Sequence, residues 1–300
     1  MQLIALDRSF ILFEAIGVDA ERYLHGRLTQ DCKKLEINTI AETLLLSPKG
    51  KIQGQFLLFR NSNDHFYLLS DPLNNSEYIQ ETQAAITSFK VADRLEVKPY
   101  GNFSYAILCS TLEEFLTAFN LSNEYSLLST FKAQINKIDC LFFIRPFGEK
   151  LIIHIFAENE LNFNLPICSD ELFAILRIKN KSPMLYLDFP ADLIGTDINY
   201  QNKISFTKGC YSGQEAIEMS IARGRPTKKL VIINSYIFPE ILPDNIIQTT
   251  TEKKIATIET LFKIDNLFSS FAIIPYSITT TDLFTWENAK QEITIEELNK

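Results

Sequence analysis

The 300-residue sequence is poor in the side chains that build metal centres and disulfide frameworks, with three histidines and five cysteines. The cysteines are odd in number and scattered, with no C-x-x-C pair, at Cys32, Cys109, Cys140, Cys168 and Cys210. Zinc sites and disulfide-rich secreted domains need paired or closely spaced ligands. We therefore expect no metal centre and no disulfide framework.

Long apolar runs and an excess of positive charge are also lacking. The formal net charge of -8 argues against a surface built to neutralise nucleic-acid phosphates or to sit on an anionic membrane. The longest apolar runs, such as 141–144 and 151–153, fall far short of the ~20 residues that span a bilayer. Asp7 and Arg8 interrupt the N-terminal segment, which lacks the pattern of a secretion signal. We expect a cytoplasmic protein without membrane contact or direct nucleic-acid binding.

What the sequence does contain is a large apolar fraction, 46% of the residues, arranged in short segments. Apolar residues at three-and-four spacing and capping residues predict helices over 19–35, from Pro72 to Phe89, over 110–119 with a capping box at Ser110 and Glu113, and over 169–178. Short runs separated by polar turns predict strands over 43–47, 52–60, 65–70, 95–97, 103–109, 141–145 and 151–156.

The order of these segments indicates the fold class. Frequent hairpins favour α+β with antiparallel sheets, because parallel strands would each need a crossover helix. A similar order recurs, so we expect two related α+β units, over 1–100 and 101–227. Beyond Lys228 the β-branched and aromatic runs over 230–237, 254–261 and 271–276 predict a small C-terminal β-barrel domain over 228–300.

The most informative segment runs from Ile204 to Glu215. Gly209 and Gly213, two of only ten glycines, flank Cys210 next to Lys208. A thiol near an ammonium group and unpaired backbone amides can be held partly as thiolate, which acts as nucleophile, redox centre or metal ligand. The alternative is that the glycines shape a turn into a helix and Cys210 packs as a small apolar residue. From the residues alone, the second interpretation is favoured.

The run Lys-Gly-Cys-Tyr-x-Gly-Gln-Glu at 208–215 resembles the motif that defines the YgfZ family of folate-binding proteins, which are related in fold to the GcvT-type aminomethyltransferases. The resemblance continues through 17–31, 46–51 and 176–178. It implies ferredoxin-like halves and a terminal barrel around a folate pocket. It also implies a tetrahydrofolate or derivative as cofactor, and a role in assembly or repair of iron–sulfur proteins, including enzymes of tRNA modification.

The resemblance also implies site residues. The functional thiol is Cys210, and its supporting residues are Lys208, Tyr211, Gln214 and Glu215. The implied folate-binding residues are Phe10, Phe173, Arg177, Gly209, Gly213 and Arg223. Phe10 and Phe173 fall where some relatives carry pocket tryptophans, so their rings could stack on a pterin. Ordinary core packing is the favoured interpretation for either phenylalanine taken singly.

One departure from the family pattern concerns an arginine. Met219 stands where the family has that arginine, and Arg223 or Arg225 is the candidate replacement. With Lys228 and Lys229 these arginines form a basic cluster that could meet the glutamyl tail of folate or a phosphate. A solvated strand edge is an equal alternative.

The aminomethyltransferases provide the main rival function. Those enzymes carry an aspartate pair just after the glycine of the first hairpin, whereas no carboxylate lies between Lys49 and Arg60 here. Lys179 likewise stands where they tend to have glutamate. Without groups that steer charge on the folate nitrogen, folate binding without transfer chemistry is favoured. A folate-dependent aminomethyltransferase or demethylase remains the alternative, and a scaffold that has lost folate binding is a third, weaker one.

Overall fold

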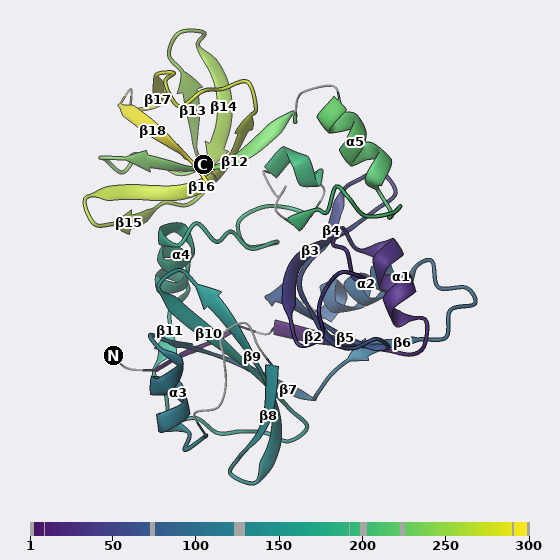
Figure 1. Cartoon of the computed structure of the whole chain (residues 1–300). Coiled ribbons are helices and arrows are strands. Elements are labelled where there is room, and N and C mark those ends of the chain that lie inside the picture. Colours follow the sequence, from purple (N-terminus) through teal and green to yellow (C-terminus); the bar gives the residue numbers. More distant parts are fainter. Residues whose placement is uncertain are drawn as a thin grey trace. The chain divides into compact units, whose positions relative to one another are not determined.

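The computed structural model describes residues 3–8, 10–72, 76–122, 130–191, 193–198, 203–222, 226–289 and 291–298. The chain divides into two compact units. The first comprises Met1–Ser169 with Asn202–Gln214, and the second comprises Asp170–Gln201 with Glu215–Lys300. Figure 1 follows the chain through both. The domain division over 1–100, 101–227 and 228–300 stays a prediction.

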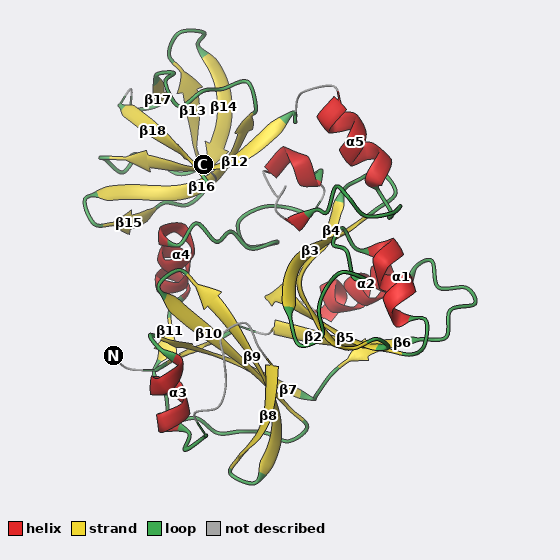
Figure 2. Ribbon diagram, viewed as in Figure 1, coloured by secondary structure: helices red, strands yellow, loops and turns green. Residues whose placement is uncertain are grey.

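The first unit begins with a five-stranded antiparallel sheet of order β3-β4-β5-β2-β6. Its strands are β2 Phe10–Ile16, β3 Ile40–Leu46, β4 Ile52–Ser62, β5 His65–Pro72 and β6 Glu96–Pro99. Helices α1 Ala20–Arg27 and α2 Ser76–Thr87 cover one face (Figure 2). Side chains that alternate along the strands reach this face, and Phe13, Phe56 and Leu68 pack there with Leu24 and Ile86 of the helices.

The second sheet of this unit has the order β11-β1-β7-β10-β9-β8. Its strands are β1 Ile4–Leu6, β7 Phe103–Cys109, β8 Thr130–Ile135, β9 Ile138–Phe147, β10 Lys150–Ala157 and β11 Ile167–Cys168. Helix α3 Leu112–Ala118 packs on one face through Phe115, against Phe142 and Ile153. The order β8-β9-β10-β7-β1 repeats that of the first sheet, so the N-terminal strand completes the second half.

The helix-free faces of the two sheets meet. Phe143 of β9 lies 5.9 Å, between ring centroids, from both Phe59 of β4 and Tyr67 of β5. Arg145 follows Phe143 by two residues on β9, and Asp71 follows Tyr67 by four residues on β5, so both lie on the same faces as these rings. Arg145 Nη1 donates to Asp71 Oδ1 at 3.2 Å. The middle layer of the first unit therefore contains a polar region beside its aromatic core.

The second unit contains helices α4 Asp170–Lys179 and α5 Gln214–Ala222 and the 3-10 helix η1 Gly195–Ile198. The first residue of α5, Gln214, is assigned to the first unit. Its seven-stranded antiparallel sheet has the order β14-β13-β17-β18-β12-β16-β15. The strands are β12 Lys228–Ser235, β13 Asp244–Gln248, β14 Lys253–Ile258, β15 Phe262–Ile264, β16 Leu267–Pro275, β17 Phe284–Trp286 and β18 Glu292–Glu297. Because β14 also contacts β16, the sheet curls around a core centred on Trp286.

The α+β class, the antiparallel sheets and the curled C-terminal sheet agree with the fold predicted from the sequence. The helix expected over 19–35 is wrong in its second half, because α1 ends at Arg27 and Leu28 is extended, with φ -98° and ψ 157°. Asp31 then makes a turn, in which its Oδ1 accepts from the amides of Lys33 and Lys34.

The capping box of α3 is one residue later than predicted. Thr111, not Ser110, is the N-cap, and its Oγ1 accepts from the Glu114 amide at 3.1 Å. The Glu114 carboxylate accepts in return from the Ser110 amide at 3.1 Å. Glu113 therefore has no part in the box. None of the helices in the described residues is long and apolar enough to cross a membrane.

Candidate functional site

The segment that leads into the motif lies along the chain after α1. The Ser205 amide donates to the Thr29 carbonyl at 2.9 Å, and the Thr29 hydroxyl donates to the Lys203 carbonyl at 2.8 Å. The buried Lys203 ammonium pairs with Glu42 at 2.6 Å on the neighbouring strand β3. These contacts bind residues 203–205 to the first sheet and bring the motif to the end of α1.

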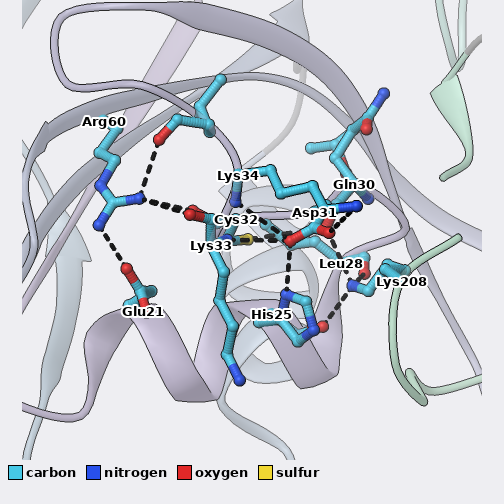
Figure 3. Close-up of polar contacts among 12 residues, drawn as sticks. Glu21, His25, Leu28, Gln30, Asp31, Cys32, Lys33, Lys34, Arg60 and Lys208 are labelled. Carbon is cyan, nitrogen blue, oxygen red and sulfur yellow. Dashed lines mark hydrogen bonds and ion pairs between the residues drawn. The ribbon is translucent and has the colours of Figure 1, made fainter.

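Lys208 is the buried anchor of the motif. Its Nζ donates to the carbonyls of His25, of Leu28 at 2.7 Å and of Gln30 at 2.9 Å (Figure 3). Carbonyls at a helix C-terminus lack intrahelical partners, and an ammonium group there also complements the helix dipole. Burial lowers the pKa of Lys208 to about 8, partly offset by the nearby Cys32 and Asp31. The three N–H groups are thus directed at backbone carbonyls, and none of these bonds goes to Cys210.

Gly213 lets the motif approach the first hairpin. Its φ is +85°, and a Cβ placed on it would lie 2.6 Å from the Ser47 carbonyl oxygen and 2.9 Å from the Leu46 Cβ. The next amide toward the N-terminus, of Ser212, donates to the Gly26 carbonyl at 3.0 Å. Only glycine combines this backbone conformation with this approach. A Cβ on Gly209, by contrast, would make only an ordinary contact, 3.7 Å from His25 Nε2.

Cys210 is exposed, whereas the other four cysteines are buried. It therefore does not pack as a small apolar residue, which was the alternative interpretation of the sequence. Burial raises the pKa of Cys32 and of Cys109 to about 12, which keeps both as protonated thiols. Among the described residues, which include all five cysteines, Cys210 is the exposed thiol.

The residues after Cys210 connect the motif to α5. Tyr211 is buried, and its ring centroid lies 5.0 Å from Lys208 Nζ. Its amide donates to Gln214 Oε1 at 3.3 Å, and its carbonyl accepts from the Gln214 amide at 3.2 Å. Glu215 is exposed in the first turn of α5. The supporting residues predicted from the motif thus divide into buried anchors, Lys208 and Tyr211, and the helix start, Gln214 and Glu215.

His25 is the neighbour of the motif that the sequence analysis did not assign. Its Nδ1 lies 3.2 Å from Asp31 Oδ1, without hydrogen-bond geometry (Figure 3). Its Nε2 would lie 3.7 Å from a Cβ placed on Gly209. Burial, and next the charge of Lys208, lower the pKa of His25, which favours the neutral imidazole. No spacing in the sequence links His25 to the motif, because Lys208, its first residue, lies 183 positions further along the chain.

The predicted folate-binding residues lie in several places. Phe10 is buried on β2, with its ring edge-on to His154 at 4.4 Å between centroids. Phe173 and Arg177 belong to the second unit, where the Phe173 ring lies 4.7 Å from the Arg177 guanidinium. That guanidinium also binds Asp188 through two hydrogen bonds, at 2.9 and 3.0 Å. Arg223 and Arg225 lie outside the described residues.

Of the basic cluster, the two lysines can be described. Lys229 is buried and pairs with Glu297 at 2.6 Å, whereas Lys228 is exposed. The Lys229 ammonium is thus already balanced within the curled sheet. Among the described residues, no group of three or more histidine, cysteine, aspartate or glutamate side chains is placed to hold a metal ion.

A second group of polar residues, which the sequence analysis missed, is buried between the sheets of the first unit. Gln55 of β4 donates from Nε2 to Asp71 Oδ2 at 2.6 Å, across the ladder that pairs β4 with β5. The other carboxylate oxygen of Asp71 accepts from Arg145 of β9 at 3.2 Å. His154 of β10 is fully buried nearby. These residues lie on four different strands, β4, β5, β9 and β10, so the group cannot be recognised from the sequence before the pairing of the strands is known.

A known structure has the same fold as this chain. Over 99% of this chain and 86% of the other, the structure matches the glycine cleavage system aminomethyltransferase T from Bartonella henselae, with a TM-score of 0.79 at 16% identity. The likeness shows the fold alone, and it places the chain in the structural class of the GcvT-like fold. No protein-family model matches the sequence.

Sequence relatives narrow this class. The chain is 28% identical over 236 residues to the tRNA-modifying protein YgfZ from Vibrio vulnificus, covering 76% of this chain and 68% of that protein. It is 25% identical over 254 residues to the protein of the same name from Colwellia psychrerythraea, covering 77% and 71%. An uncharacterized protein of Haemophilus influenzae is 26% identical over 234 residues, covering 77% and 72%. The resemblance to the YgfZ proteins, predicted from the motif, is confirmed.

Proposed function

We propose that this chain is a cytoplasmic, tetrahydrofolate-binding accessory protein that supports the assembly or repair of iron–sulfur proteins, including enzymes of tRNA modification. Its similarity to proteins named tRNA-modifying protein YgfZ supports the biological setting. The observation that carries the proposal is the exposed Cys210, presented on a loop whose neighbours Lys208 and Gly213 are bound to α1 and to the first hairpin.

The arrangement suits a thiol that acts on a partner. Anchors on both sides of Cys210 order the loop before a partner arrives, so little conformational entropy is lost when the thiol is engaged. Lys208 supplies this order through three carbonyl contacts. A thiolate is the form that attacks a disulfide or binds a metal, and exposure gives a partner access to it.

A folate-dependent aminomethyltransferase or demethylase is the second candidate function, and one observation keeps it in consideration. Asp71 of β5 places a buried carboxylate beside Gln55 of β4, and Gln55 lies in the stretch after Gly50 where the transferases carry their aspartates. Both oxygens of Asp71 already accept hydrogen bonds from protein side chains. That leaves the carboxylate less available for proton exchange with a ligand than a free catalytic acid would be.

Complementation tests the first function. A strain that lacks its own protein of this type should be rescued by the wild-type chain and by Cys140→Ala, which removes a buried thiol. Cys210→Ala should fold, retain tetrahydrofolate affinity and fail to rescue. Full rescue by Cys210→Ala would refute a functional thiol. For the second function, turnover of a methylated or aminomethylated donor with tetrahydrofolate is measured, and we expect no turnover by a folded, folate-bound sample.

A further inference from the structure

The first unit contains a cavity of about 470 Å³ at the end of its second sheet, near the turn between β8 and β9. This volume lies in the range of small-molecule binding sites. Strands β8, β9 and β10 provide most of the lining, and the segment after β6 provides the rest. The residues that matter for its chemistry are Tyr100, Lys132, Gln134, Asp139, Phe156 and Glu158. None of them belongs to the motif at 208–215, so the cavity is a separate feature of the fold.

Strand pairing brings two carboxylates to the same end of this sheet. Ala157 of β10 pairs with Cys140 of β9, and this is the last pair of their ladder. Asp139 precedes Cys140 and Glu158 follows Ala157, so both carboxylates leave the ladder at the same end. Like charges at neighbouring positions of adjacent strands destabilise a sheet. A positive charge near both carboxylates would remove this cost.

The described part of the chain does not supply that positive charge. Asp139 Oδ1 accepts from Gln134 Nε2 at 2.8 Å, and Glu158 Oε2 accepts from Asn102 Nδ2 at 2.9 Å. Both donors are neutral carboxamides, and the second oxygen of each carboxylate accepts no hydrogen bond from a described residue. Lys132 lies two residues from Gln134 on the same face of β8, yet it forms no ion pair with a described residue. Two carboxylates and one ammonium group leave the lining with one negative charge in excess.

Tyr100 gives the cavity an aromatic wall that is held in place. Its amide donates to the Leu12 carbonyl at 2.8 Å, and its ring lies edge-on to Tyr67, with the centroids 5.5 Å apart. The Asn102 amide donates to the Ala157 carbonyl at 3.0 Å, which ties this segment to the end of β10. The wall is therefore ordered before any ligand arrives.

The electrostatic surroundings of Tyr100 are negative. Burial raises the pKa of Tyr100, and nearby acidic groups, among them Glu14, Glu158 and Asp139, raise it further. Glu14 is paired with His65 at 2.9 Å, whereas the two cavity carboxylates have no such partner. The cavity thus combines an aromatic ring with uncompensated negative charge, which are the two features that attract an organic cation.

We propose that this cavity binds an organic monocation with a guanidinium group on a short alkyl stem. The planar, forked guanidinium can donate to Asp139 and to Glu158 together and can lie against the Tyr100 ring. The alkyl stem then contacts Phe156. This chemistry occurs in free small guanidines and in the arginine side chain of a polypeptide, so both sources are tested. The site goes beyond the proposed function and does not depend on folate binding.

The test is calorimetric titration of the full chain with butylguanidine, with Nα-acetyl-arginine-N-methylamide and with butanol, which has the stem without the charge. Asp139→Asn and Glu158→Gln remove one charge each at similar size. Glu149→Gln is the matched control, because Glu149 is exposed in the turn at the other end of β9 and β10. We expect saturable binding of a guanidinium compound and none of butanol. Each site variant should weaken the binding about fivefold, and the control should match the wild type.

Lys132→Gln tests the sign of the charge. It removes a positive charge from the lining, so it should strengthen binding of the cation, whereas a ligand held through a carboxylate would bind more weakly. Thermal melts of all variants without ligand should show that each remains folded, because the substituted side chains are exposed.

The two guanidinium compounds distinguish the sources. Binding of butylguanidine alone would identify a free small guanidine, and equal binding of the blocked arginine would identify a polypeptide side chain. Several results would overturn the site: no binding of either cation to a folded sample, butanol binding as tightly as butylguanidine, unchanged affinity in both carboxylate variants, or weaker binding by Lys132→Gln.

Discussion

Replacing Gly213 with alanine should destabilise the first unit and release the motif from the first hairpin. The residue has φ +85°, and the added Cβ would lie 2.6 Å from the Ser47 carbonyl oxygen, 2.9 Å from the Leu46 Cβ and 3.1 Å from the Gly50 Cα. All three atoms are backbone or directly attached to it, so none can rotate away. The hairpin or the motif must therefore shift.

The expected magnitude has two parts. A left-handed backbone costs an alanine about 1–2 kcal/mol, and forcing an atom into a filled site costs about 1–3 kcal/mol. We expect a loss of roughly 3 kcal/mol, which for a domain of 150–250 residues lowers the melting temperature by about 6–12 °C. Far-ultraviolet circular dichroism during thermal unfolding measures the change.

Two matched substitutions test the reasoning. A Cβ on Gly26 meets nothing within 4 Å, so Gly26→Ala in α1 should be neutral or stabilising by up to about 1 kcal/mol. Gly209→Ala makes only a 3.7 Å contact with His25 and should be tolerated. The account of the motif as a docked loop would be refuted by a Gly213→Ala protein as stable as the wild type, or by equal losses at Gly209 and Gly213.

Three further outcomes follow from the same structure. Lys208→Met should lose about 2–4 kcal/mol in urea unfolding, because three carbonyls of the α1 end lose their donor, and Lys208→Arg should recover part of it. In the native protein a bulky thiol reagent should label Cys210 before any other cysteine, as peptide mass mapping would show, and simultaneous labelling would contradict the burial of the rest. Burial lowers the pKa of His154 in the folded protein, so below about pH 6.5 the unfolded chain binds a proton that the folded chain does not. The free energy of unfolding should therefore decrease as the pH is lowered below about 6.5, by up to about 1.4 kcal/mol per pH unit from this group. His154→Leu should flatten that dependence, and an unchanged slope would contradict a buried neutral ring.

The sequence predicted the first sheet well because its strands alternate and are separated by short polar turns. The predicted meander over 43–47, 52–60 and 65–70 corresponds to β3, β4 and β5. β3 begins three residues earlier and ends one residue earlier than predicted, and β4 and β5 each end two residues later. Helix α1 shows where local pattern fails. Its apolar periodicity continues past Arg27, but Leu28 turns to an extended conformation and bridges to Leu45, and Lys208 from far along the chain binds the exposed carbonyls.

The sequence predicted only those site residues that lie close together along the chain. The motif indicated Cys210, Lys208 and Gly213 because they fall within six residues. The structure binds Lys208 to the end of α1 and places Gly213 against the first hairpin, with Cys210 exposed between them. The polar surface of Gln55 and His154 was missed because its members lie on strands of two different sheets. Pairing between distant strands is a tertiary property, and no period or spacing in a single sequence carries it.

Titration of the purified chain with tetrahydrofolate decides whether this protein binds a folate. Calorimetry is preferable to fluorescence, because the single tryptophan, Trp286, is wholly buried in the curled sheet of the second unit, with Nε1 bonded to Ser235. We expect saturable binding at one site in the micromolar range, about -8 kcal/mol on the standard scale. No heat of binding from a folded sample at several temperatures would contradict it.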